Sequence, residues 1–183
     1  ELGNNSKASD LYSYVIKKGS SYQMIFYSRI SRALLANSKN RKNLKEELLK
    51  LAKDEKYVEF RDQIYYALGD LELQEYNQEK GVEYLEKSAS YPPSNKTQKA
   101  KTFLRLADVY YGEKDYVFAQ KYYDSTLSVL DSENPNFEIV KEKLSNAVKN
   151  QHKVLLFSQF VEHLNLFKAY LNNTNQRLLL GYT

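Results

Sequence analysis

Along the first 150 residues, apolar side chains recur at intervals of three and four positions, the spacing that gathers them on one face of a helix. Leu44, Leu48 and Leu51 form one such series, and charged residues fill many of the positions between them. Glycine and proline, which interrupt helices, number only six and three in 183 residues. The pattern predicts an all-α fold made of short amphipathic helices, each with one face buried.

Two segments of this pattern carry small residues at the same offsets. Gly81 follows Gly69 by twelve positions, and Ala119 follows Ala107 by the same distance. At the next offsets each segment has a large apolar residue and then a small one: Leu85 and Ser88, Tyr123 and Thr126. Small residues at such places let the two helices of a hairpin approach closely, and the later residues form one stripe of the second helix. The spacing resembles that of tetratricopeptide repeats.

The resemblance to tetratricopeptide arrays implies a right-handed α-solenoid over residues 1–150. The predicted units are a partial repeat at 1–20, a degenerate repeat at 22–56, clear repeats at 61–91 and 99–131, and a closing helix at 137–150. A generic bundle of amphipathic helices is the alternative. Apolar periodicity alone, however, does not require small residues at recurring offsets.

Several stretches also resemble one family of tetratricopeptide proteins. They are 62–68, 115–120, 122–130 and 134–137, within a similarity that covers residues 5–149. The family consists of lipoproteins of gliding motility and type IX secretion (SprE/PorW type). The resemblance implies a periplasmic scaffold, attached to the outer membrane only by a lipid anchor upstream of Glu1, that links parts of this machinery. A cytoplasmic tetratricopeptide adaptor is an alternative.

The last segment, residues 151–183, has a different character. His152–Phe160 predicts a short buried strand, residues 161–171 have a helical apolar period, and Arg177–Thr183 predicts a second strand. The segment resembles the opening of the second helicase lobe of Swi/Snf-type ATPases, although Leu180 and Tyr182 stand where that family has Asp and Ser. We expect a strand–helix–strand appendage, either a remnant joined to a truncated repeat protein or a genuine extension that packs on the last repeat. A fragment associated with such an ATPase is therefore an alternative function.

The chemical groups in the sequence do not point to catalysis. The chain has no cysteine, its two histidines are eleven residues apart, and it contains no Gly-x-x-x-x-Gly-Lys-Ser/Thr phosphate loop. The net charge of +4 is a mild excess in the first third of the chain, less dense than a nucleic-acid-binding face. We expect a non-enzymatic protein with no cofactor, no metal, no small-molecule substrate and no nucleic-acid partner.

A tetratricopeptide array binds a partner in the concave groove formed by its first helices. Placed by the resemblance, the groove residues of this chain are Arg32, Gln63, Tyr66, Asp70, Lys101, Asp108 and Tyr111. Tyr66 and Tyr111 are expected to anchor a protein or peptide ligand, because a tyrosine buries a large ring while its hydroxyl keeps a hydrogen bond. Asp70 and Asp108 are expected to favour a basic ligand. Asp70 would repel the C-terminal carboxylate that chaperone-binding members hold.

Overall fold

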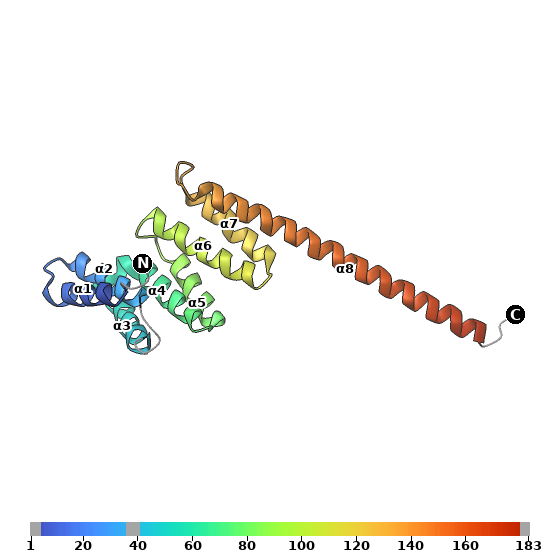
Figure 1. The fold of residues 1–183 in the computed structure, drawn as a ribbon, viewed down its shortest axis with the longest axis horizontal. Coiled ribbons are helices and arrows are strands. Elements are labelled where there is room, and N and C mark those ends of the chain that lie inside the picture. The colour runs from blue at the N-terminus through green and yellow to red at the C-terminus, as the bar shows by residue number, and fades with distance from the viewer. Residues whose placement is uncertain (1–4, 36–40, 180–183) are drawn as a thin grey trace.

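The computed structural model describes residues 5–35 and 41–179, with side chains described as far as Tyr170. Regular structure in this part of the chain is entirely helical (Figure 1), which confirms the predicted all-α class. The helices are α1 (Asn5–Lys18), α2 (Tyr22–Leu34), α3 (Arg41–Lys53), the 3₁₀ helix η2 (Glu55–Phe60), α4 (Arg61–Gln74), α5 (Gln78–Ser90), α6 (Lys96–Gly112), α7 (Tyr116–Val129) and α8 (Phe137–Leu179).

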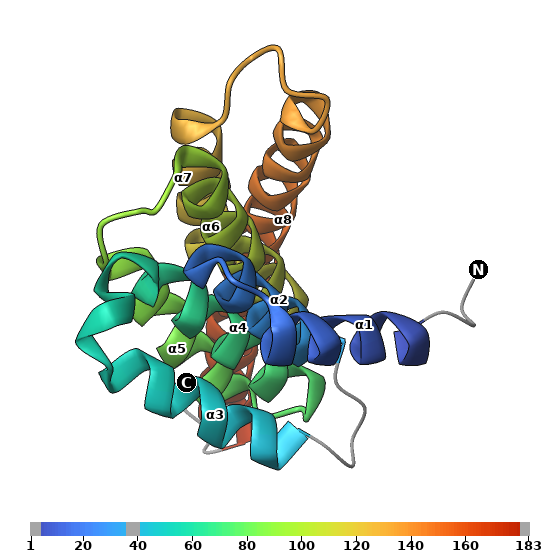
Figure 2. The same ribbon diagram turned by 90° about the vertical axis from the view of Figure 1, so that its left-hand side faces the viewer.

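Helices that follow one another in the chain pack against one another. The closest packing joins α4 with α5 and α6 with α7, so these pairs form two helical hairpins. Contacts between α2 and α4, and between α4 and α6, join alternate helices as well. The first half of α8 packs on α7, and its second half continues beyond the body as a single helix (Figure 1). In Figure 2 the first half of α8 stands beside α7, and its far end lies behind the body.

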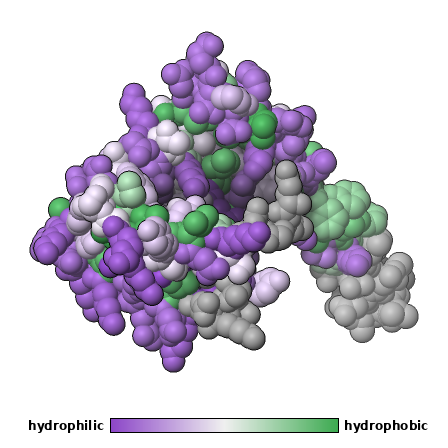
Figure 3. Space-filling view, turned by 60° about the vertical axis from the view of Figure 1, so that its left-hand side comes forward, coloured by the Kyte–Doolittle hydropathy of each residue, from purple (hydrophilic) through white to green (hydrophobic). Residues whose placement is uncertain are grey.

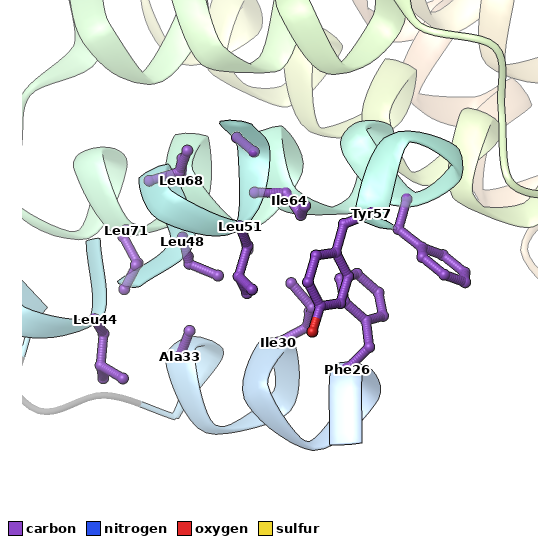
Figure 4. Packing of buried hydrophobic residues seen from close by; sticks show 13 residues of the cluster. Phe26, Ile30, Ala33, Leu44, Leu48, Leu51, Tyr57, Ile64, Leu68 and Leu71 are labelled. Atoms are coloured by element: carbon purple, nitrogen blue, oxygen red, sulfur yellow. The ribbon is translucent and has the colours of Figure 1, made fainter. Parts of the chain in front are cut away.

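The first core lies between α2, α3 and α4 (Figure 4). Phe26 and Ile30 of α2 pack with Leu51 of α3 and with Ile64 and Leu68 of α4, and all five side chains are buried. Burying one such side chain stabilises a fold by about 1.5–3 kcal/mol. The leucine series that predicted a helix at 44–51 is therefore the face that α3 contributes to this core.

Small residues lie where the two helices of each hairpin cross. A Cβ atom on Gly69 of α4 would lie 3.0 Å from the backbone oxygen of Gly81, and one on Gly81 of α5 would lie 2.6 Å from Leu73 Cδ2. In the second hairpin, Ala107 of α6 and Ala119 of α7 stand at the equivalent positions and are fully buried. The offset of twelve residues thus marks a close approach of two helices in both hairpins.

The turns of the two hairpins share one backbone conformation. Tyr76 and Lys114 have φ angles of 59° and 65°, which non-glycine residues rarely adopt. The amide of Asn77 donates to the carbonyl of Glu72, the closing hydrogen bond of a Schellman cap, and Asp115 makes the same bond one hairpin later. The structural repeat therefore includes the connection between the helices.

The predicted strand–helix–strand appendage is wrong for the described residues. Helix α8 runs without a break from Phe137 to Leu179, past the predicted end of the closing helix at residue 150 and through the predicted strand at His152–Phe160. Residues 180–183, at the end of the second predicted strand, lie outside the described residues. An isolated strand leaves its backbone groups unpaired, whereas a helix pairs them internally, and no glycine or proline between 137 and 179 interrupts it.

Leucine at position 81 should overpack the first hairpin. A Cβ atom there already comes within 2.7 Å of Leu73 Cγ, so we expect Gly81→Leu to lower the free energy of unfolding by about 1–3 kcal/mol. Gly112→Ala is the control, because nothing lies within 4 Å of a Cβ atom at that position. Urea unfolding followed by circular dichroism measures both variants. Equal stability of Gly81→Leu and wild type would contradict the close crossing.

Removal of residues 156–183 should leave the body folded. The side chains of α8 from His152 to Tyr170 are exposed, and the contacts of α8 with α6 lie earlier, at Lys143 with Asp108 and at Asn150 with Tyr111. We expect the truncated chain to unfold cooperatively at the wild-type urea midpoint, because units of a helical array contact mainly their neighbours. A non-cooperative transition in the truncated chain would show that the extension stabilises the body.

Candidate partner-binding surface

Equivalent ion pairs join α4 to α6 and α6 to α8. Asp70 of α4 lies 2.8 Å from the guanidinium of Arg105 in α6, and Asp108 of α6 lies 2.8 Å from the ammonium of Lys143 in α8. Each pair spans 35 residues. The same junction is therefore built twice, and α8 takes the position that α6 takes in the preceding unit.

The ion pairs lie on one surface, formed by α4, α6 and α8. The ring of Tyr66 lies beneath this surface and is part of the fold. It is 8% exposed and packs with Leu85 and Leu106. The ammonium of Lys101 lies 4.8 Å above the ring, in the geometry of a cation–π contact. Burial raises the pKa of Tyr66 to about 12, and the nearby charge of Asp70 adds to this effect. The anchor role predicted for this ring would need it to be accessible, and it is largely covered.

Lys101 is the accessible cation of the surface. Its side chain is exposed, and in the part of the chain that the structure describes no carboxylate lies within ion-pair distance of it. Arg105 and Lys143 are 35% and 40% exposed and each has a carboxylate partner. Three basic side chains thus stand among two acidic ones. Because Asp70 and Asp108 are already ion-paired, the preference for a basic ligand that their charges predicted does not follow.

Tyr111 and Asn150 occupy the next position along the surface. The amide of Asn150 in α8 donates a hydrogen bond of 2.9 Å to the hydroxyl of Tyr111, which is half-buried. The Tyr111 ring also meets the rings of Tyr116 and Tyr123 edge-on, with centroids 5.5 and 6.5 Å away. One edge of Tyr111 is therefore fixed by packing, while part of it stays accessible to a ligand.

Asp108 connects the surface with the core. It accepts a hydrogen bond of 2.7 Å from the hydroxyl of Tyr123, a residue that is only 2% exposed. It also forms the ion pair with Lys143. Burial and the hydrogen bond to Asp108 together raise the pKa of Tyr123 far above its usual value. The position of this carboxylate is thus fixed from two helices.

Two predicted groove residues lie apart from this surface. Arg32 forms an ion pair with Glu47 of α3 at 2.6 Å and lines a cavity of about 660 Å³ between α1, α2 and α3. Gln63 is buried, and its amide donates to the Ser94 hydroxyl at 2.8 Å in the loop before α6. The structure brings together five of the seven predicted residues, all from α4 and α6: Tyr66, Asp70, Lys101, Asp108 and Tyr111.

Three members of the surface were not expected from the sequence, namely Arg105, Lys143 and Asn150. A signal for two of them was present, because an acidic and a basic residue recur 35 positions apart in successive units. Asn150 has no comparable signal. Its contact with Tyr111 depends on the angle at which α8 crosses α6.

Comparison with known proteins assigns no function to this surface. No protein-family model matches the chain, and no curated protein matches it. Within the described residues, no three potential metal ligands come together. Each helix in that part of the chain is also too short or too polar to cross a bilayer.

The raised pKa of Tyr66 predicts a loss of stability at alkaline pH. In the unfolded chain the phenol ionises near pH 10, whereas in the folded chain it keeps its proton until about pH 12. The contribution of Tyr66 to the free energy of unfolding is complete below pH 10 and is lost as the pH rises from 10 to 12. At pH 11 we expect a loss of about 1 kcal/mol from this residue. Urea unfolding at pH 9 and 11 measures it, and an equal loss in Tyr66→Phe would contradict the assignment.

Proposed function

We propose that this chain is a non-catalytic scaffold for protein–protein interaction, built as a right-handed solenoid of tetratricopeptide-like hairpins. The observation that carries the proposal is the surface of α4, α6 and α8, on which Lys101 is exposed and has no carboxylate partner among the described residues. The repeated ion pairs at Asp70 and Asp108 support a regular stacking of units. So do the small residues at the hairpin crossings and the matching turns.

The ligand that suits this surface is an extended segment of a partner protein with acidic or carbonyl-rich character. Lys101 has no carboxylate partner among the described residues, and Arg105 and Lys143 keep part of their surface in water. Tyr111 and Asn150 add a hydroxyl and an amide. Neighbouring packed helices lie about 8–10 Å apart, so about three residues of extended chain would reach from one helix to the next.

The proposed location follows from the resemblance to the gliding-motility and type IX secretion lipoproteins. We place the scaffold in the periplasm, held at the outer membrane by a lipid anchor, where it would link parts of that machinery. A cytoplasmic adaptor would use the same surface. A Swi/Snf-type fragment gains no support from the fold, since His152–Phe160, which resembles the first strand of that lobe, is helical here.

Reversal of charge at Lys101 should weaken binding to the partner. We expect Lys101→Glu to lower affinity about tenfold, equal to about 1.4 kcal/mol, because the introduced carboxylate would repel an acidic segment. Lys80→Glu is the matched control, since Lys80 is exposed on α5, away from the surface. The partner is first captured by a photo-crosslinking residue at position 104 on α6, separately from periplasmic and cytoplasmic extracts.

Binding of the captured protein is then titrated against wild type and both variants. Equal affinities for all three would contradict the proposed surface. Capture from the cytoplasmic extract alone would retain the surface and overturn the periplasmic location.

A further inference from the structure

The second half of α8 carries large apolar side chains that the body does not cover. Leu156, Phe157, Phe160 and Phe167 are between 59% and 69% exposed, and Leu164 is 43% exposed. In Figure 3 the green atoms at the right, next to the grey end of the chain, belong to this part of α8. Contiguous apolar surface of this kind on a water-exposed helix marks an interaction site.

The spacing of these residues suits pairing with another helix. Phe157, Phe160, Leu164 and Phe167 follow one another at intervals of three, four and three, which is the a and d spacing of a heptad seam. Between them lie mostly polar residues: Ser158, Gln159, Glu162, His163 and Asn165. The four apolar residues therefore form one stripe along about 15 Å of helix.

The stripe points away from the body. Val140 and Ala147 in the first half of α8 are buried against α7 and define the side of the helix that faces the body. At about 100° per residue, the centre of the stripe is turned by roughly 130° from that side. The body therefore neither covers the stripe nor stands in the path of a second helix laid along it.

We propose that two copies of this chain associate through the stripe, as an antiparallel two-stranded coiled coil. The stripe has the same spacing in both directions. Phe157 would lie opposite Phe167 of the second copy, and Phe160 opposite Leu164 of the second copy. Two identical stripes meet without burying a charge, since none of the four residues is charged. An antiparallel arrangement also places the two bodies at opposite ends, where they do not collide.

The exposed area sets the strength of this association. A phenylalanine buries about 150–250 Å² when fully covered, so the three partly exposed rings offer on the order of 350 Å² per helix. Two copies, each with the exposed part of Leu164, then bury on the order of 850 Å², below the size of about 1,200 Å² at which stable specific interfaces begin. Interfaces of that size are weak and reversible. We expect a dimer that dissociates in the micromolar range.

Sedimentation equilibrium of the full chain between about 1 and 500 μM tests the proposal. The expected result is a mass that rises from 21.4 kDa toward twice that value with concentration. Phe160→Glu places a charge in the seam and should keep the chain monomeric. Leu166→Glu is the matched control, because Leu166 is 63% exposed on roughly the opposite side of the same helix, and it should dimerise like wild type. Circular dichroism verifies that both variants keep a folded body.

Disulfide trapping tests the orientation, and the absence of native cysteine makes introduced cysteines unambiguous. A mixture of Phe160→Cys and Leu164→Cys chains should form the mixed crosslink, whereas crosslinks of each variant with itself would mean a parallel pair and overturn the arrangement. A monomeric mass at all concentrations would overturn the dimer, as would equal dimerisation of Phe160→Glu and wild type. A chain that stays monomeric but floats with phosphatidylglycerol vesicles would assign the stripe to a lipid surface instead.

Discussion

The contact between the backbones of α4 and α5, at Gly69 and Gly81, is the constraint on which the arrangement of the body depends. Two helices that touch at small residues form a narrow hairpin with a defined crossing, and the alanine pair of the next hairpin gives it a similar shape. Units of similar shape that stack in sequence place equivalent side chains at equivalent junctions. The ion pair between Asp70 and Arg105, and its counterpart at Asp108 one unit later, are the direct result.

Local sequence signals were sufficient to predict most of the helices of the body. The apolar series and the small residues at twelve-residue offsets report contacts within one helix or one hairpin, and such contacts depend on few distant residues. The end of α8 was predicted wrongly for a related reason. Val154–Phe157 is an apolar run that suits a buried strand, but a strand needs a neighbour to pair with. Without one, the helix that began at Phe137 continues.

The candidate surface could be predicted only in part, because it depends on contacts between units. The resemblance placed Lys101 and Tyr111 on the first helix of the last hairpin, and both residues lie on α6. The resemblance could not show that Tyr66 lies beneath Lys101, nor that Asp70 is neutralised by a base 35 residues away. Those outcomes are set by the distance and angle between stacked hairpins. Hence the helices that carry these residues could be predicted, whereas the pairing of their charges could not.

The continuity of α8 has a mechanical consequence. The same rigid helix is packed against α7 at one end and extends about 35 Å past the body at the other, over roughly 24 residues. A change of about 10° in its tilt on α7 would move the far end by about 6 Å. By this geometry, a small change of tilt at the Asp108–Lys143 junction, on the face where we propose that a partner binds, becomes a displacement several times larger at the tip.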